Sequence, residues 1–300
     1  MKNTIKKTIK VITPWLVPRK IVNVGIKTIR WALIPPYVKN KIRGNVKFLN
    51  NHKGERCFIL ATGPSIAKQN LLGLRNETCI AVGDFYLHPD AKVINPEYQV
   101  IAPMHQPFDD KLVLTIMDGY KKQYSENTTY FFGYSPYESS YNAVFNRNPL
   151  SRPKKEFYIN YSGSRFLEED TYKSKKMWDI CGTPFSCMTV VFSAIQIALY
   201  MGFDKIYLLG CDHDYLERKL IGKGFDNHHF YKDKEDGIEG IVKFLDDFSL
   251  EQWFYQYYYR WKQYRLMKQY AQEKGQVILN ATHGGMLDVF DRVKFEDIKI

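Results

Sequence analysis

The sequence predicts an α/β fold, a Rossmann-like, doubly wound and mostly parallel sheet. Short apolar runs at residues 56–61 (RCFILA) and 205–210 (KIYLLG) are typical of strands that are buried on both faces. A nearly all-apolar stretch of helical length, residues 189–201, stands directly before the second run, as expected of a helix that crosses over between parallel strands. With 300 residues, of which 45% are hydrophobic, the chain is long enough for one such domain.

The first half of this pattern begins after residue 54. We expect a strand at 56–61, a helix from about 65 to 72, and further strands at 78–82 and 98–102. The stretch from about 109 to 176 is rich in Tyr, Asn and Ser. We expect it to be an insertion or a substrate lid, with candidate strands at 129–132 and 156–160.

The second half is more regular. The helix of residues 189–201 should end at Gly202, a natural residue for the left-handed position after a helix, and be followed by the strand at 205–210. A polar loop at 212–240 leads into a long aromatic helix at 249–274, and a last strand follows at 276–279. We expect one stripe of the aromatic helix to pack on the sheet.

The charge is concentrated at one end of the chain. Of the 43 Lys and Arg, 13 lie in residues 1–54, which contain no Asp or Glu, so residues 55–300 carry 30 basic against all 32 acidic side chains. A nucleic-acid-binding domain would carry its cations on the folded body, so we expect no nucleic-acid partner. We therefore divide the chain into an arm, residues 1–54, and a catalytic domain, residues 55–300.

The arm is amphipathic, because its cations alternate with apolar residues that include Trp15 and Trp31. No apolar run in it is long enough to span a bilayer, and no signal peptide is visible. We expect residues 1–54 to lie on an anionic membrane surface, which makes the protein cytoplasmic and peripheral on the inner face of the cytoplasmic membrane. The alternative is that its short amphipathic pieces pack on the protein's own body.

The first candidate motif joins the strand at 56–61 to the helix after it. Thr62, Gly63, Pro64 and Ser65 form a strand-to-helix turn, where free backbone N–H groups and the helix dipole favour a phosphate. Its spacing is neither that of a G-x-G-x-x-G fingerprint nor that of a P-loop, and the alternative is an ordinary turn. Asp84, just beyond the second strand, stands where doubly wound sheets often hold a residue that reads a ribose or base.

The second candidate motif follows the strand at 205–210. Gly210, Asp212 and Asp214 should lie at the carboxyl edge of the sheet, where ligands bind. An Asp-x-Asp pair at this edge could hold Mg²⁺ or Mn²⁺ against a diphosphate. Alternatively, Asp212 accepts hydrogen bonds from loop N–H groups and Asp214 is solvated.

Two further motifs stand in the loops near this edge. His228 and His229 are candidates for a general base, because histidine exchanges protons near neutral pH, although a histidine pair on a loop is also common at an ordinary surface. Residues 279–287 (LNATHGGML) either close the site from the other side or form only a tight connection.

The order of these motifs resembles two known families. It resembles the MptE-like family, whose named member is a 6-hydroxymethylpterin pyrophosphokinase, and it is similar to the bacterial family-42 sialyltransferases. In the latter a Gly-Pro-Ser turn also follows the first strand, and a Gly-Phe/Tyr-x-x-Ile-Tyr-Leu-x-Gly-x-Asp segment is matched here by residues 202–212. The resemblance covers about residues 54–296 in motif order.

The resemblance to the sialyltransferases implies roles for individual residues. That family holds a CMP-sugar with the Gly-Pro-Ser turn and with small hydroxyl residues before the long helix, here Ser186 or Thr189. Its base is a histidine in the loop after the Asp-bearing strand, which here contains His228 and His229, although the family's His-Tyr-Ile-Gly-His spacing is not reproduced. The family works without metal, whereas the Asp-x-Asp pair leaves a metal-dependent variant open.

We therefore expect a glycosyltransferase of bacterial cell-surface polysaccharide or lipooligosaccharide biosynthesis. Its donor would be a nucleotide-activated sugar, such as a CMP-linked sialic-acid-like sugar, its acceptor a glycan or a lipid-linked glycan, and it would require no cofactor. The first alternative is diphosphate transfer from ATP to a pterin alcohol, which requires Mg²⁺. The second alternative is an inactive, membrane-bound scaffold.

Overall fold

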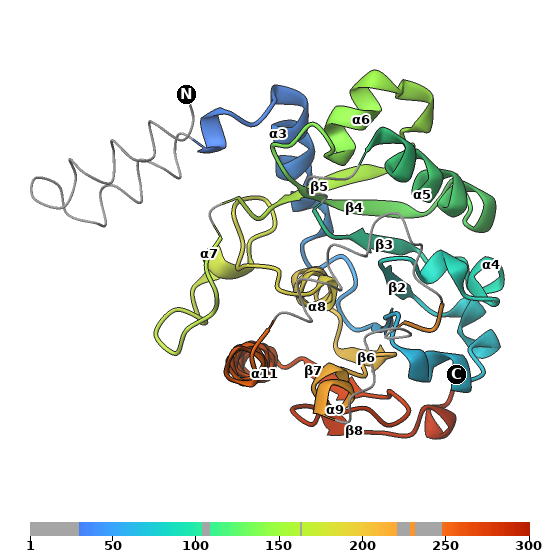
Figure 1. Cartoon of the computed structure of the whole chain (residues 1–300), viewed down its shortest axis with the longest axis vertical. Coiled ribbons are helices and arrows are strands. Elements are labelled where there is room, and N and C mark those ends of the chain that lie inside the picture. The colour runs from blue at the N-terminus through green and yellow to red at the C-terminus, as the bar shows by residue number, and fades with distance from the viewer. Residues whose placement is uncertain (1–29, 104–108, 163, 221–228, 232–247) are drawn as a thin grey trace, which may run out of the picture.

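The computed structural model describes residues 30–103, 109–162, 164–220, 229–231 and 248–300. These residues form one eight-stranded sheet in the order β5-β4-β3-β2-β1-β6-β7-β8, in which all neighbouring strands are parallel (Figure 1). The doubly wound parallel sheet is therefore confirmed. The strands are β1 (Arg56–Leu60), β2 (Cys79–Val82), β3 (Tyr98–Ile101), β4 (Thr129–Tyr134), β5 (Glu156–Asn160), β6 (Lys205–Leu209), β7 (Val277–Asn280) and β8 (Asp291–Arg292).

The strand order reverses at β1. The chain builds β2 to β5 outward on one side of β1, then returns to place β6, β7 and β8 on its other side. In open parallel sheets the crevice that binds ligands lies outside the carboxyl ends of the strands at such a reversal. The boundary between β1 and β6 is therefore where a ligand site is expected.

Helices cover both faces of the sheet (Figure 1). On one face lie α7, α8 and α11, and on the other lie α3, α4, α5 and α6. Their bounds are α3 (Pro36–Arg43), α4 (Ala91–Ile94), α5 (Asp110–Gln123), α6 (Tyr141–Arg147), α7 (Lys175–Trp178), α8 (Val190–Met201), α9 (Tyr215–Leu220) and α11 (Leu250–Glu273).

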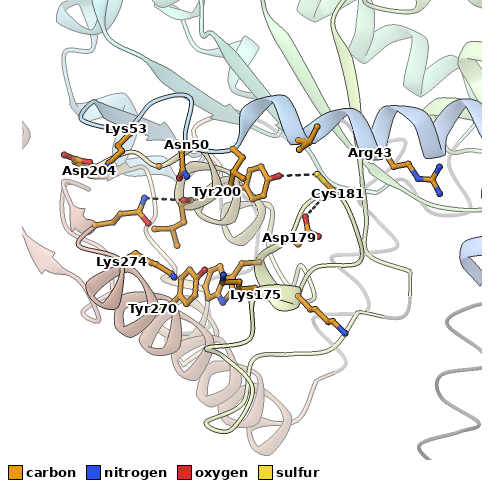
Figure 2. A pocket seen from close by; sticks show the side chains of 17 residues that line it. Arg43, Asn50, Lys53, Lys175, Asp179, Cys181, Tyr200, Asp204, Tyr270 and Lys274 are labelled. Carbon is orange, nitrogen blue, oxygen red and sulfur yellow. Dashed lines mark hydrogen bonds between the residues drawn. The ribbon is translucent and has the colours of Figure 1, made fainter.

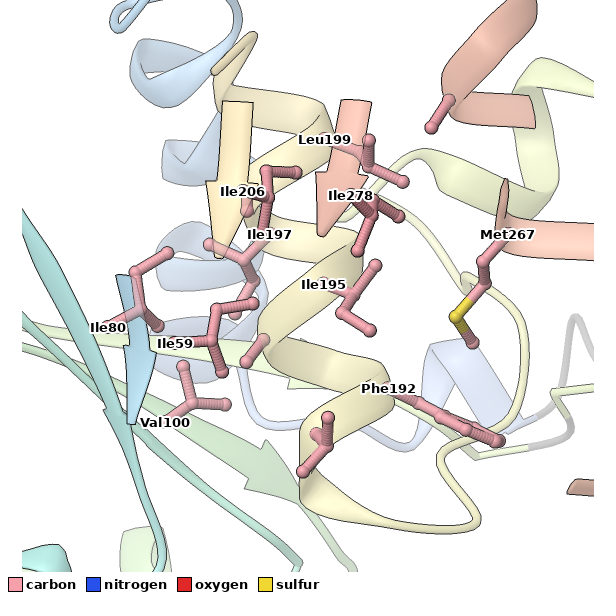
Figure 3. Close-up of a cluster of buried hydrophobic side chains, with 14 of the residues drawn as sticks. Ile59, Ile80, Val100, Phe192, Ile195, Ile197, Leu199, Ile206, Met267 and Ile278 are labelled. Atoms are coloured by element: carbon pink, nitrogen blue, oxygen red, sulfur yellow. The ribbon is translucent and has the colours of Figure 1, made fainter. Parts of the chain in front are cut away.

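Helix α8 is the central element of the first face. Figure 3 shows it lying over the strands, with its Ile195 and Ile197 near Ile59 of β1 and Ile206 of β6. It ends as expected at Gly202, whose φ of 84° is the left-handed conformation that glycine adopts without strain. Because α8 leads into β6 through a tight turn, it runs antiparallel to the strands, and its first residues lie at their carboxyl edge.

Helix α11 also begins and ends close to the expected residues. Ser249 accepts a hydrogen bond from the Gln252 N–H while the Gln252 side chain accepts one from the Ser249 N–H, a capping box that starts the helix. Tyr257, Tyr264 and Met267 are buried against the body, whereas other aromatic residues of the helix are exposed. The expected stripe of α11 that packs on the sheet is confirmed.

The helix expected at residues 65–72 is wrong. The structure has two 3₁₀ turns instead, Pro64–Lys68 and Leu72–Asn76. Gln69 between them is extended, and the Asn70 side chain accepts a hydrogen bond from the N–H of Leu72. This local side-chain bond competes with helical hydrogen bonding and stops the first turn after five residues.

The segment expected to be an insertion largely belongs to the sheet. The candidate strands at 129–132 and 156–160 are confirmed as β4 and β5, and α5 and α6 pack beside them. The tyrosines that suggested a loop are core residues, since Tyr120, Tyr141 and Tyr158 are fully buried. Among the described residues of this segment, those at 161–162 and 164–174 lie outside a strand–helix unit, and the lid expectation is corrected for residues 110–160.

Part of the predicted arm packs on the body. Ile34, Val38 and Ile42 are buried in and beside α3, and Phe48 is buried in the 3₁₀ turn that follows. Asn45 donates hydrogen bonds to the carbonyls of Tyr158 and Ile180 and so joins this segment to the sheet. Residues 34–48 thus follow the alternative of packing on the protein's own body.

Residues 1–29 lie outside the described residues, and for them the membrane expectation stays a prediction. Within the part of the chain that the structure describes, none of the helices has the length and hydropathy needed to cross a bilayer.

A pair of glycines tests the connection from α8 to β6. Gly202 and Gly275 both have positive φ, but a Cβ on Gly202 would lie 3.0 Å from Asn50 Oδ1, whereas one on Gly275 would meet nothing within 4 Å. Gly275→Ala should cost about 1–2 kcal/mol of unfolding free energy from backbone strain alone. Gly202→Ala should lower the unfolding free energy measured in urea by more than Gly275→Ala, because its Cβ would also press against Asn50. Equal losses of unfolding free energy would contradict the close packing of Asn50 against Gly202.

Candidate active site

Two turns meet at the carboxyl edge of the sheet where the strand order reverses. The chain after β1 passes through Gly63, and the chain after β6 passes through Gly210. The Gly63 N–H donates to the Gly210 carbonyl at 2.9 Å, which continues the β1–β6 ladder one step beyond the strands. The structure therefore brings the first two predicted motifs together.

Neither turn has room for a side chain at its glycine. A Cβ on Gly63 would lie 2.0 Å from Asp212 Oδ2 and 2.4 Å from the Gly210 carbonyl oxygen. Gly210 has a φ of +67°, and a Cβ there would lie 2.8 Å from the Ala61 carbonyl oxygen. Glycine is required at both positions because the two backbones touch.

A buried carboxylate joins the two turns. Asp212 accepts hydrogen bonds from the Ser65 N–H at 3.2 Å and from the Ser65 hydroxyl at 2.8 Å. Burial raises the pKa of Asp212, the negative charge of Asp214 raises it further, and the bonds from Ser65 oppose the shift. Asp212 therefore positions the turn after β1, as the alternative interpretation of the Asp-x-Asp motif expected.

The backbone of the Gly-Pro-Ser turn differs from the expected phosphate cradle. The N–H groups of Gly63, Ser65 and Ile66 are bonded to the Gly210 carbonyl, to Asp212 and to the Gly63 carbonyl. Pro64 has no N–H, and the element that follows is a 3₁₀ turn rather than an α-helix with a developed dipole. The expected row of free N–H groups is therefore wrong, because the chain bonds them internally.

His229 lies directly on this turn. A hydrogen bond of 2.9 Å joins its Nδ1 to the Thr62 hydroxyl, and the Phe230 N–H donates to the Thr62 carbonyl at 3.0 Å. The Phe230 ring packs against His88, with ring centroids 5.2 Å apart. Thr62 thus fixes Nδ1 of His229 and with it the orientation of the ring. His228 lies outside the described residues.

Asp84 lies at the same edge, one strand away. It follows β2, the neighbour of β1, after Gly83, whose added Cβ would lie 3.9 Å from the Thr62 methyl carbon. The Gly83 carbonyl accepts hydrogen bonds from the Gln99 side chain and the Tyr120 hydroxyl, which hold this turn from below. The half-buried Asp84 thus follows a turn that lies against Thr62.

Ser186 and Thr189 precede and cap α8 at this edge. Thr189 is the N-cap residue, but its side chain makes no capping hydrogen bond, and both residues are half-buried. The first N–H groups of a 12-residue α-helix carry the positive end of its dipole. At this edge it is therefore α8, and not the element after the Gly-Pro-Ser turn, that begins an α-helix with a developed dipole.

The expected metal ligands fit a divalent cation poorly. Both carboxylate oxygens of Asp212 already accept hydrogen bonds from Ser65. Among the described residues, no three His, Cys, Asp or Glu side chains are grouped in a way that could hold a metal ion. A Mg²⁺ or Mn²⁺ site at Asp212 and Asp214 stays a prediction.

Sequence reasoning missed the residues that support the Asp212 loop. His213 has a left-handed φ of 52°, its Nε2 is 2.6 Å from the Tyr264 hydroxyl, and the Tyr257 hydroxyl donates to its carbonyl. Burial, and secondarily the charge of Arg260, lower the pKa of His213 to about 3. His213 is therefore neutral near pH 7 and is not a base that exchanges protons there.

The segment at 279–287 supports the same loop from the far side. The Thr282 hydroxyl accepts a hydrogen bond from the Cys211 N–H, and the Met286 N–H donates to the Asp212 carbonyl. Arg292 donates to the carbonyls of Gly284 and Gly285 and fixes the double-glycine turn. His283 in this turn is exposed. Of the two expectations for this segment, closing the site or forming only a tight connection, the contacts support the tight connection, which packs against the Asp212 loop.

Comparisons with known proteins give a likeness of fold. No protein-family model matches the sequence, and no curated protein matches it significantly. The solved structure of the sialyltransferase CstII from Campylobacter jejuni with a substrate analogue, cytidine-5′-monophosphate, is 12% identical, with a TM-score of 0.45, over 80% of this chain and 85% of that chain. The sialyltransferase CST-II with a trisaccharide acceptor and CMP is 13% identical, with a TM-score of 0.43, over 79% of this chain and 85% of that chain.

These structures are sialyltransferases, the second of the two kinds of protein that the motif order resembles. The MptE-like resemblance is shown by no family model and no curated protein, and it stays a prediction. At 12–13% identity the likeness concerns the fold, and the function is inferred from the contacts of this chain.

The raised pKa of Asp212 predicts a pH dependence of stability. A carboxyl group whose folded pKa lies above its unfolded value contributes stability below the unfolded pKa and loses it as pH rises through the folded pKa. Asp212→Asn removes this titration and keeps the shape of the side chain. The unfolding free energy of the wild type, relative to Asp212→Asn, should therefore fall from acidic pH toward neutrality. Parallel pH curves for the two proteins would contradict the assignment, and Asp118→Asn, at an exposed carboxylate, is the control.

Proposed function

We propose that this chain is a glycosyltransferase that moves a sugar from a CMP-linked donor to a hydroxyl of a glycan or lipid-linked acceptor. The observation that carries the proposal is the Thr62–His229 contact at the β1–β6 reversal, with the amino end of α8 at the same edge. A potential base, hydroxyl side chains and a helix amino terminus are thus placed where doubly wound folds bind nucleotides.

The reaction needs one proton acceptor and one place for negative charge. The acceptor hydroxyl attacks the anomeric carbon of the donor, and its proton passes to Nε2 of His229, whose ring is oriented by Thr62 through Nδ1. The bond between the anomeric carbon and the phosphate oxygen breaks, and CMP leaves with the bonding electrons. The amino end of α8, with the hydroxyls of Thr189 and Ser186, would stabilise this phosphate.

The nucleoside would extend from the phosphate toward β2. Thr62, Gly63 and Pro64 would form the floor of this path, because Gly63 lets the backbone lie against Gly210 and Asp212. Asp84 stands at its far end and is placed to accept a hydrogen bond from a ribose hydroxyl or from the amino group of a base. Asp212 and Gly210 act beneath the floor and hold it in place.

The biological setting that we propose is assembly of a bacterial cell-surface polysaccharide or lipooligosaccharide on the inner face of the cytoplasmic membrane. The support for this setting is the arm, because residues 1–29 contain seven Lys or Arg and no acidic residue. Cations of this density favour an anionic lipid surface, where lipid-linked acceptors are located.

Substitution of the histidines tests the chemistry. His229→Ala should lower transfer or hydrolysis of a CMP-sugar by about 10²–10⁴-fold, because it removes the general base. The thermal shift produced by CMP should change little, since binding depends on other residues. His283→Ala, at an exposed histidine of the neighbouring turn, is the matched control and should be as active as the wild type.

The outcomes separate the alternatives. Full activity of His229→Ala with loss in His228→Ala would overturn the assignment of the base. Release of AMP from ATP in the presence of a pterin alcohol would replace the proposal with diphosphate transfer, and no turnover with any nucleotide would favour an inactive scaffold.

The proposed membrane binding of residues 1–29 is tested separately. Removal of residues 1–29, which spares the buried segment at 34–48, should weaken cosedimentation with liposomes rich in phosphatidylglycerol several-fold and leave CMP-sugar turnover in solution unchanged. Addition of about 0.5 M salt should release the full chain, since the interaction is electrostatic. Unchanged sedimentation of the shortened chain would contradict a membrane role for residues 1–29.

A further inference from the structure

A hollow lies at the edge of the sheet opposite the candidate active site (Figure 2). Its volume is about 850 Å³, and its lining comes from the end of α3 and the turn after it, from α7, and from the last residues of α8 and α11. Lys53 and Asp204 stand just before β1 and β6, so the hollow is at the amino ends of the strands. A five-residue strand spans roughly 16 Å, which separates the hollow from the turn at Gly63.

The hollow carries an excess of positive charge. Five cations line it against two carboxylates, and the cations are Arg43, Lys53, Lys175, Lys176 and Lys274. Among the described residues none of these cations forms an ion pair. The carboxylates are instead engaged by the backbone, since Asp179 accepts from the Cys181 N–H and Asp204 from the Gly54 N–H. The cations are thus left to an anion from outside.

Helix ends account for only part of this charge. Arg43 and Lys274 stand at the carboxyl ends of α3 and α11, where a cation also complements the helix dipole. Lys53 belongs to the loop before β1, so no helix end explains it. Lys175 and Lys176 belong to α7, which has four residues and is too short to develop a dipole. Figure 2 shows Lys175 and Lys274 close to Tyr270, so side chains from α7 and α11 converge on one wall.

The walls and the rim of the hollow are apolar. The rings of Trp178 and Tyr270 are stacked with centroids 3.8 Å apart, and the Lys274 ammonium lies 5.4 Å from the Tyr270 centroid. At the rim, the side chains of Val46 and Leu49 are 61% and 52% exposed. Lysines around aromatic walls, with exposed aliphatic residues at the opening, match a phosphate that carries an apolar chain.

We propose that this hollow binds the headgroup phosphate of an anionic phospholipid and so seats the amino edge of the sheet on a membrane. Residues 1–29 are excluded as the occupant, because they are strongly cationic and would be repelled by the five cations. Free phosphate would use the lysines but would leave the exposed Val46 and Leu49 without a partner. The proposal is independent of the glycosyltransferase reaction at the other edge, and the two can fail separately.

Site-resolved lysine labelling of the full chain tests this binding. Acetylation rates of individual lysines are measured by peptide mass spectrometry without additive and in the presence of one of three additives. The additives are dihexanoyl phosphatidylglycerol below its micellar concentration, dihexanoyl phosphatidylcholine and inorganic phosphate. Phosphatidylglycerol should slow labelling of Lys53, Lys175, Lys176 and Lys274 several-fold, whereas phosphatidylcholine and phosphate should have little effect. Lys92 and Lys111, which are exposed elsewhere on the body, should be unaffected by all three.

A pair of charge-reversal variants provides the second part of the experiment. Lys175→Glu combined with Lys176→Glu should abolish the protection of Lys53 and Lys274, and Lys92→Glu combined with Lys111→Glu, which changes the net charge equally, should retain it. All four substituted side chains are exposed, and unchanged melting temperatures verify folding. Equal protection by phosphate or by phosphatidylcholine, protection confined to the lysines of residues 1–29, or retained protection in the first pair would each overturn the proposal.

Discussion

The contact between the ends of β1 and β6 determines where the rest of the site can be. Asp212 is buried against the Gly-Pro-Ser turn, bonds both the N–H and the hydroxyl of Ser65, and leaves no space for a side chain at Gly63. Burying a carboxylate is costly unless donors compensate it, and Ser65 supplies two. With the two turns locked together, Thr62 is held at the carboxyl edge, and His229 and Phe230 dock on it.

The residues that support the loops of the site differ from those proposed to contact the substrate. Four side chains only hold the loops in place, because their hydrogen bonds are made to other residues of the protein. They are Asp212, His213, Tyr257 and Thr282. In the proposed reaction the groups that meet the substrate are Thr62, Asp84, His229 and the residues at the start of α8. The two edges of the sheet also differ in character: the carboxyl edge presents hydroxyls, a histidine and a helix amino end, whereas the amino edge presents lysines around aromatic walls.

Much of the fold was predictable from local sequence pattern, because buried parallel strands and an apolar crossover helix are continuous in the chain. β1, β2, β3, β6, β7 and α8 lie within two residues of their expected bounds. The segment of α5, β4, α6 and β5 was read as an insertion, because its core is built from tyrosines that also suit a surface. The Ser65–Asp212 pair joins residues 147 positions apart, and a local sequence pattern cannot predict such a long-range contact. The same holds for Arg292 and Tyr257, whereas the placement of His229 near the turn agrees with the expected site.

The most direct test of the central claim, that a nucleotide binds at the carboxyl edge where the strand order reverses, is amide hydrogen exchange with and without CMP. The account predicts slower exchange in peptides that contain residues 61–68, 84–88 and 186–192, with no change in peptides at the amino edge, such as residues 50–55. Protection confined to the amino edge, or no protection at CMP concentrations that shift the melting temperature, would contradict it.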